Sequence, residues 1–137
     1  ALPLVSRGLA VGDVDDDGDL DLLESNLDGP ARLLLAASAP DRRWLGLEIV
    51  GAASGRPLLG TVATLRLSDG RLLVRHVHHD GSYASSRDPR LVFGLTGTAE
   101  PIELIVVPPG QPPVNLAVPE PGRYTRIALS ESLIRSP

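Results

Sequence analysis

The 137-residue chain contains no cysteine, no lysine and no methionine, and all 13 of its basic residues are arginine. The absence of cysteine excludes a disulfide-bonded scaffold, a thiol nucleophile, a cysteine-ligated zinc site and an iron–sulfur cluster. It does not define the compartment, because secreted proteins need not carry disulfides. Since residue 1 is not methionine, we expect the chain to be a processed product or a part of a longer protein.

Aromatic residues are also scarce, at 3% of the chain, whereas leucine occurs 24 times. We therefore expect an aliphatic core. No apolar run approaches the roughly 20 residues that a membrane-spanning helix needs, so no membrane span is expected. The arginines are scattered and there is almost no aromatic platform, which argues against nucleic-acid binding.

Turn-forming residues recur every 8–12 positions, and short apolar stretches of strand length lie between them. This pattern predicts an all-β protein with about ten strands. The expected strands are Leu9–Val11, Leu20–Ser25, Ala31–Leu35, Trp44–Val50, Val62–Leu67, Leu72–Val77, Leu91–Phe93, Ile102–Val107, Val114–Val118 and Tyr124–Leu129. Asp69-Gly70 is the strongest hairpin signal, and only Ser130–Arg135 has a pattern compatible with a helical turn or two.

A change in composition at residues 37–43 divides the chain into two units. We expect a small N-terminal unit at 1–36, a β-domain at 44–130 and a tail at 131–137. Because 36 residues cannot bury a core alone, the N-terminal unit must pack on the β-domain, on preceding sequence or on another chain.

The formal net charge of −4 is distributed very unevenly. Residues 13–28 contain eight acidic residues and no base, whereas the other 121 residues contain nine acidic residues and 13 arginines. A general acidic composition would be a matter of solubility, but a local charge of −8 requires a local explanation.

The acidic window contains the pattern DxDxDGxxD, in which carboxylates at alternate positions converge when the chain curls. Gly18 permits the positive φ that closes the curl. Such an array of hard oxygen ligands suits Ca²⁺, and the alternative interpretation is a solvated acidic loop. The expected ligands are Asp13, Asp15, Asp17, Asp19 (through its main-chain carbonyl) and Asp21.

The same window also satisfies the EF-hand pattern, with Glu24 at its twelfth position. An EF-hand needs a helix on each side of the loop. The twelve upstream residues include Pro3, Gly8 and Gly12, and Gly29-Pro30 follows Glu24 within five residues, so neither flank can form a useful helix. We therefore expect the loop to join two β-strands and Glu24 to be a strand residue.

Residues 8–22, GLAVGDVDDDGDLDL, resemble the FG-GAP/VCBS repeat, the calcium-loop hairpin of β-propeller blades, and Asn26 and PARL at 30–33 continue the resemblance. The following sequence resembles the ASPIC/UnbV domain, which typically closes secreted proteins of this repeat type. The matching stretches are WLGL at 44–47, LGTV at 59–62, DGSYASS at 80–86 and LVFGL at 91–95. Thr61 stands where the family usually has alanine, VPPG at 107–110 replaces a Trp-Pro-x-Gly motif, and a single repeat is present where a propeller needs several.

The two resemblances imply one propeller-type calcium-loop hairpin packed on a β-sandwich or barrel-like domain. They also imply a secreted, extracellular or periplasmic location and no particular reaction. Our main hypothesis is a non-enzymatic, Ca²⁺-binding extracellular β-module that interacts with a protein or matrix partner. One alternative is a structural subunit of a self-assembling polymer, in which the hairpin pairs with a neighbouring chain. A third is an accessory protein of a biosynthetic enzyme.

Two further groups of residues are candidate sites. His76 and His78 share one face of an expected strand, and Asp80 could join them as a metal ligand; the alternative is a polar strand edge that leads into the Asp80-Gly81 turn. The three serines nearby would suggest a hydrolase only if a nucleophile elbow were present, and the sequence has none. These serines are Ser82, Ser85 and Ser86.

Overall fold

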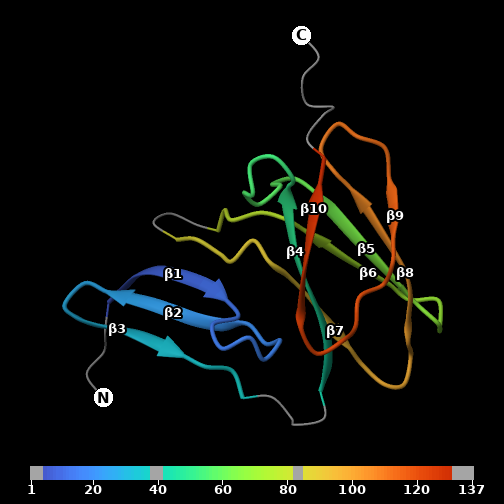
Figure 1. The fold of residues 1–137 in the computed structure, drawn as a ribbon. Helices are drawn as coiled ribbons and strands as arrows, with labels where there is room; N and C mark the ends of the chain where they lie inside the picture. The colour runs from blue at the N-terminus through green and yellow to red at the C-terminus, as the bar shows by residue number, and fades with distance from the viewer. Residues whose placement is uncertain (1–4, 38–41, 82–84, 131–137) are drawn as a thin grey trace.

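The computed structural model describes residues 5–37, 42–81 and 85–130, and within these ranges the chain forms ten β-strands and no helix. The strands are β1 (Ser6–Gly12), β2 (Asp21–Asn26), β3 (Gly29–Leu34), β4 (Arg43–Gly51), β5 (Val62–Leu67), β6 (Leu72–His76), β7 (Leu91–Leu95), β8 (Pro101–Val107), β9 (Val114–Leu116) and β10 (Tyr124–Leu129). They form three sheets, so the predicted all-β fold is confirmed (Figure 1). No helix in the described part of the chain is long and apolar enough to cross a membrane.

Each predicted strand has a counterpart, although most of the strand boundaries differ from the expectation by one to three residues. Two of these differences affect the interpretation. The turn expected at 28–30 is centred on Leu27–Asp28, so Pro30 lies inside β3. Proline is tolerated there because β3 is an edge strand of its sheet. Strand β6 ends at His76, which places His78 beyond the strand. Most of the helical turn predicted near the C-terminus lies outside the described residues.

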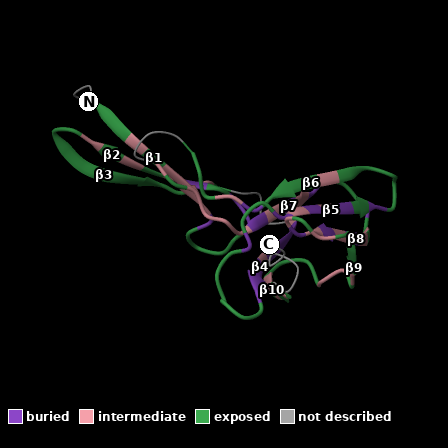
Figure 2. Ribbon diagram, turned by 90° about the horizontal axis from the view of Figure 1, so that it is seen from above, coloured by how far each residue is buried: buried purple, intermediate pink, exposed green. Residues whose placement is uncertain are grey.

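Two of the sheets pack face to face and enclose the hydrophobic core. One has the order β10-β4-β7, with β10 parallel to β4, and the other is the antiparallel sheet β6-β5-β8-β9. The buried residues concentrate between them (Figure 2). The core is mostly aliphatic, as the composition predicts, and Phe93 is its one aromatic member among the described residues.

The hairpin of β5 and β6 illustrates how local sequence specifies this sandwich. In β5, Ala63, Leu65 and Leu67 point into the core and are at most 1% exposed, whereas Arg66 between them faces solvent. This alternation follows from the two-residue period of a strand. The turn uses Gly70 at a φ of +88°, which confirms the hairpin predicted from Asp69-Gly70.

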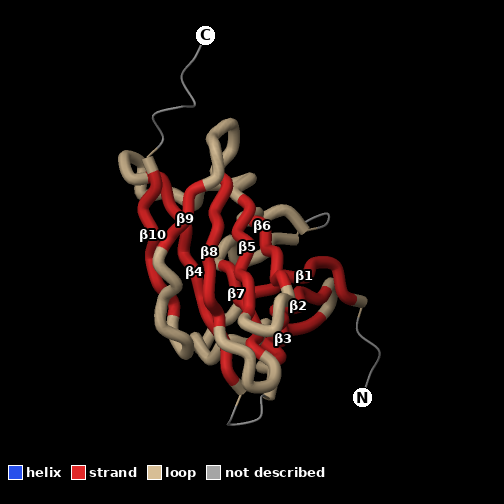
Figure 3. Tube along the Cα trace, turned by 90° about the vertical axis from the view of Figure 1, so that its right-hand side faces the viewer, coloured by secondary structure: helices blue, strands red, loops and turns tan. Residues whose placement is uncertain are grey.

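The third sheet, β1-β2-β3, is an antiparallel meander that projects from the sandwich (Figures 2 and 3). No residue of β1 or β3 is buried, and leucines on its strands, such as Leu23 and Leu33, are nearly half exposed. This sheet therefore has no hydrophobic core of its own. Its contacts with the sandwich come from β1 and from the loop between β1 and β2, which contains the acidic motif.

Candidate metal centre

The acidic loop spans residues 13–20 and is closed at its base by β1 and β2, where Gly12 pairs with Asp21. Within the loop the chain adopts positive φ at Asp16 (+58°) and at Gly18 (+89°). Aspartate and glycine are among the residues that tolerate this left-handed conformation. The two reversals curl the chain back on itself, as predicted from the position of the glycine.

The strands on both sides of the loop distinguish it from an EF-hand, which would have helices there. Glu24 is the fourth residue of β2 and lies opposite Leu9 of β1 and Arg32 of β3. Its carboxylate lies 3.8 Å from Arg32 Nη1. The prediction that Glu24 is a strand residue is therefore confirmed.

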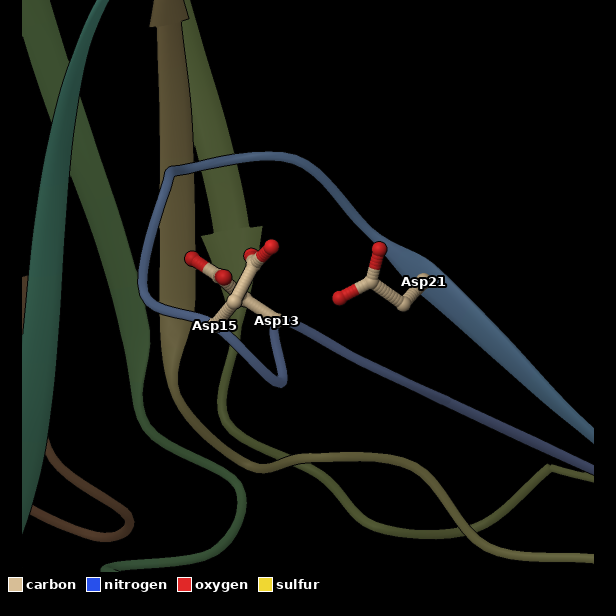
Figure 4. A group of neighbouring side chains, drawn as sticks. All are labelled: Asp13, Asp15 and Asp21. Carbon is tan, nitrogen blue, oxygen red and sulfur yellow. The ribbon is translucent and has the colours of Figure 1, made fainter. Parts of the chain in front are cut away.

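Three of the five predicted ligands come together at the base of the loop (Figure 4). Asp13, Asp15 and Asp21 each offer a carboxylate oxygen, and these oxygens all lie within 4.8 Å of one another. Asp13 and Asp21 are each only 2% exposed, whereas Asp15 faces solvent. Within the described ranges, no other group of three acidic or histidine side chains has this arrangement.

Main-chain N–H groups orient the two buried carboxylates. Both oxygens of Asp13 and both oxygens of Asp21 accept at least one such bond, which fixes the side chains without supplying a formal positive charge. The donors are Asp17 and Gly18 for Asp13, and Val14 and Ala36 for Asp21, at 2.8–3.1 Å.

The other acidic side chains of the loop have separate partners. Asp17 Oδ1 accepts a bond of 2.9 Å from the N–H of Asp19. The nearly buried carboxylate of Asp19 pairs with the guanidinium of Arg42. Asp16 pairs with Arg90 at 2.6 Å. The structure thus brings together three carboxylates of the predicted set and directs that of Asp19 toward an arginine; the predicted role of Asp19 uses its main-chain carbonyl instead.

The three clustered carboxylates, those of Asp13, Asp15 and Asp21, form no ion pair with any described residue. Arg90 donates instead to the main-chain oxygen of Asp13, at 2.5 Å. Desolvation, together with the negative charges of Asp17, Asp21 and Asp13, raises the pKa of the Asp15 carboxyl. Uncompensated buried carboxylates are destabilising. A donor set made only of hard oxygens fits Ca²⁺, whose two positive charges would offset most of the three negative ones.

Comparison with protein families finds a match for the second part of the chain. The family model described as ASPIC and UnbV matches residues 51–131, more than half of the chain. The chain belongs to the ASPIC and UnbV family. A comparison with curated proteins found no match. The matched segment starts at the end of β4 and includes β5 to β10, whereas the acidic loop and the β1-β2-β3 sheet precede it.

The β-sandwich holds the acidic loop through two aromatic residues, Trp44 of β4 and Tyr124 of β10. The Tyr124 hydroxyl donates to Asp13 Oδ2 at 2.8 Å. The Trp44 ring packs on Gly18 so closely that a Cβ built there would lie 2.2 Å from Trp44 Cγ. The two rings meet edge to face, with centroids 5.2 Å apart. Burial, the hydrogen bond to Asp13 and the negative charge of Asp13 all raise the pKa of Tyr124. The Tyr124 hydroxyl therefore keeps its hydrogen and remains a donor.

Arg90 provides a third connection between the domain and the loop. It donates to Asp88 through Nε (2.7 Å) and to Asp16 through Nη1 (2.6 Å), and its guanidinium lies 4.2 Å from the centre of the Tyr124 ring. The hydrogen bond that Arg90 donates to the Asp88 carboxylate is the main cause that raises the pKa of Arg90. Sequence reasoning did not identify Trp44, Tyr124 or Arg90 as loop contacts, because no local spacing connects them to it.

The ASPIC/UnbV domain also covers the outer edge of β1. Val11 donates its N–H to the carbonyl of Ser86 at 3.2 Å and accepts a bond of 2.7 Å from the N–H of Asp88. This short parallel bridge, between Val11 and Arg87, occupies backbone groups that an edge strand would otherwise expose. The N-terminal sheet is therefore attached to the domain both by its loop and by its first strand.

The histidine and serine groups are bonded in ways that fit a polar strand edge. His78 bonds to Asp80 through Nδ1 (3.0 Å) and to Arg87 through Nε2 (3.1 Å), so both ring nitrogens have protein partners. Ser85 Oγ accepts the N–H of Leu9, and Ser86 Oγ donates to a main-chain carbonyl. Ser82 lies outside the described residues.

Proposed function

We propose that this chain is a Ca²⁺-binding, non-enzymatic β-module of a secreted protein, in which the bound ion fixes the N-terminal hairpin to the ASPIC/UnbV domain for interaction with a protein or matrix partner. The observation that carries the proposal is the convergence of Asp13, Asp15 and Asp21. Two of these carboxylates are buried, and none has a basic partner among the described residues.

In this proposal the three clustered carboxylates bind the ion, and Asp17 and the main-chain carbonyl of Asp19 complete the ligand set. The resemblance of residues 8–22 to an FG-GAP/VCBS calcium-loop hairpin supports the choice of Ca²⁺ over other hard cations. Outside cells, even weak binding, with a Kd of about 10⁻⁴–10⁻³ M, would keep such a site occupied. That affinity range agrees with the proposed extracellular or periplasmic location.

The contacts of the loop give the ion a structural role. Asp13 accepts the hydroxyl of Tyr124, and Gly18 packs on Trp44, so any cation that orders the loop also orders its contact with the domain. The ring nitrogens of His78 bond to Asp80 and Arg87, and the Ser86 hydroxyl donates to a main-chain carbonyl. These two side chains therefore do not form a Ser–His pair, which supports the proposed non-enzymatic role.

The test is a calorimetric titration of the metal-free chain with CaCl₂ and MgCl₂, combined with thermal unfolding in Ca²⁺ and in chelator. We expect Ca²⁺ to raise the melting temperature, because a ligand at 100 times its Kd stabilises the fold by about 2.7 kcal/mol. Trp44 is the chain's one tryptophan, so its fluorescence reports on the loop. An unchanged melting temperature and unchanged fluorescence on adding Ca²⁺ would overturn the proposal.

A second candidate function is self-assembly through β3. The outer edge of β1 is covered by the segment around Arg87, but the outer edge of β3 has no partner strand among the described residues. All six residues of β3 are exposed, including Leu33 and Leu34. An exposed edge strand with apolar side chains can pair with another chain. Under this hypothesis a second copy of the chain extends the N-terminal sheet.

A further inference from the structure

A cleft of about 360 Å³ lies where the N-terminal hairpin meets the ASPIC/UnbV domain. Its size is at the lower end of the roughly 300–1,000 Å³ typical of ligand sites. Val11 and Leu20 form one side, the β6 residues Val74 and Arg75 form another, and Arg87 lies on the segment that bridges to β1. The cleft is distinct from the carboxylate cluster, since none of the three clustered aspartates lines it.

Two arginines of this cleft have no acidic partner among the described residues. Arg75 donates through Nε to the carbonyl of Val92 (2.9 Å) and through Nη1 to that of Val74 (2.9 Å), and it lies over the Phe93 ring. Its Nη2 makes no hydrogen bond within the described structure. Neutral carbonyls orient this guanidinium and leave its charge uncompensated.

Arg87 is oriented in a similar way by a histidine. Its Nη1 bonds to Nε2 of His78 at 3.1 Å, and Nδ1 of the same ring lies 3.0 Å from Asp80 Oδ1. Because a guanidinium can only donate, Nε2 must be the acceptor and Nδ1 must carry the hydrogen, which makes the ring neutral. Arg87 therefore keeps its full charge, and its Nε and Nη2 make no side-chain bond in the described part of the chain.

The other charged groups at the cleft have partners of their own. Arg90 pairs with Asp88 and Asp16, and the largely exposed Asp80 carboxylate, which does not line the cleft, bonds to His78. Arg75 and Arg87 are thus the two lining guanidiniums that form no ion pair with a described residue. Beside them, Leu20 and Val74 expose 51% and 44% of their surface, respectively. The cleft combines two oriented cations with apolar walls.

We propose that this cleft binds an acidic side chain of a protein partner, whose carboxylate is held by Arg75 and Arg87 while flanking apolar residues contact Leu20 and Val74. Guanidinium groups recognise carboxylates through paired, charge-assisted hydrogen bonds. The acidic loop next to the cleft repels a polyanion such as a nucleic acid or a sulfated glycan, whereas it repels a single carboxylate with apolar neighbours much less, because the repulsion grows with the number of negative charges. The inference rests on the proposed interaction role and names the chemistry of the partner.

The test is an NMR titration of the full chain in Ca²⁺ with two peptides, acetyl-leucyl-glutamyl-leucine amide and its glutamine counterpart. We expect the glutamate peptide to shift the side-chain Nε–H signals of Arg75 and Arg87, and the glutamine peptide to leave them unchanged. R87Q should weaken binding about tenfold, the effect of losing one charge-assisted contact. R56Q, which changes an exposed arginine outside the cleft, is the matched control and should bind like the unaltered chain.

Arg87 is the primary variant because Arg75 also connects β6 to β7, so R75Q is interpreted only if its melting temperature is unchanged. Equal binding of both peptides, unchanged affinity of R87Q, or displacement of the glutamate peptide by equimolar inorganic phosphate would each overturn the inference. Calcium binding is measured on the same sample without peptide. If the chain binds calcium but not the glutamate peptide, the proposed carboxylate cleft is refuted and the calcium site is not. If it binds the glutamate peptide but not calcium, only the proposed calcium site is refuted.

Discussion

Tyr124 donates its hydroxyl hydrogen to Asp13 Oδ2 at 2.8 Å, a bond between residues 111 positions apart in the chain. Asp13 is the first carboxylate of the acidic loop, and Tyr124 begins the last strand of the ASPIC/UnbV domain. The bond therefore links the proposed ion site to the end of the sandwich. Asp13 also accepts N–H groups from Asp17 and Gly18, so the same carboxylate organises the loop and attaches it.

Replacing Tyr124 with phenylalanine tests this link. Y124F retains the ring that meets Trp44 and removes only the donor to Asp13. Hydrogen bonds to charged groups contribute more than neutral ones, so we expect a loss of about 1–2 kcal/mol in unfolding free energy. Calcium affinity should fall about threefold to tenfold, because the carboxylate is less well oriented. Denaturant unfolding and calorimetry measure the two effects; unchanged values for both would show that the bond is not formed in solution.

Gly18 and Gly70 provide a matched pair of substitutions. Both have a positive φ, near +89° and +88°, but a Cβ at Gly18 would overlap Trp44, whereas a Cβ at Gly70 would meet nothing within 4 Å. G70A should lower the unfolding free energy only by the cost of placing alanine at a positive φ, about 1 kcal/mol. G18A should lower the unfolding free energy by at least about 2 kcal/mol. It should also shift the fluorescence emission of Trp44 to the red, because the loop no longer covers the indole ring. Equal effects of the two variants would contradict the packing of the loop on Trp44.

Asp15→Asn should have opposite effects with and without calcium. The pKa of Asp15 is raised above 3.8 in the folded protein by desolvation and by neighbouring carboxylates, so the metal-free folded state binds more protons than the unfolded state. Stability from this group therefore falls as the pH rises through that range. D15N removes the penalty and should raise the melting temperature of the metal-free protein at neutral pH, while it weakens calcium binding at least roughly tenfold.

The control for this experiment is D28N, since Asp28 belongs to the same acidic window but lies in the turn between β2 and β3. D28N should leave calcium affinity unchanged. If D15N and D28N behave alike in calcium titrations, the position of Asp15 in the cluster has no bearing on the ion, and the loop would be an ordinary solvated acidic segment.

The exposed edge of β3 leads to a prediction about association. If a second copy pairs with this edge, the mass from light scattering should rise with protein concentration, and Leu33→Lys should abolish the rise by placing a charge on the edge strand. Leu72→Lys, which alters an exposed leucine of the domain strand β6, is the matched control and should still associate. A monomeric mass at every concentration would remove self-assembly from consideration.

Local sequence was sufficient to predict much of the secondary structure and the acidic loop. The alternation of Ala63, Leu65 and Leu67 with polar neighbours predicts a strand with one buried face. The spacing of the aspartates and the position of Gly18 predict a curled loop, and the lack of helical flanks predicts a hairpin in place of an EF-hand. These features depend on φ preferences and side-chain periodicity, which residues a few positions apart determine.

Other features were decided only by the tertiary structure. The spacing of the loop predicts five ligands, yet the carboxylates of only three of them converge. Asp17 accepts the N–H of Asp19, and the Asp19 carboxylate pairs with Arg42. Asp16, which is not in the predicted set, pairs with Arg90. Which arginine approaches which carboxylate depends on how the sandwich places β4 and the segment before β7 beside the loop. The hydroxyl of Tyr124 on Asp13 has the same origin. The chain by itself therefore determined an acidic hairpin and a ten-strand β fold, whereas long-range packing decided which carboxylates remain without a countercharge, because electrostatic partners are chosen by proximity in space.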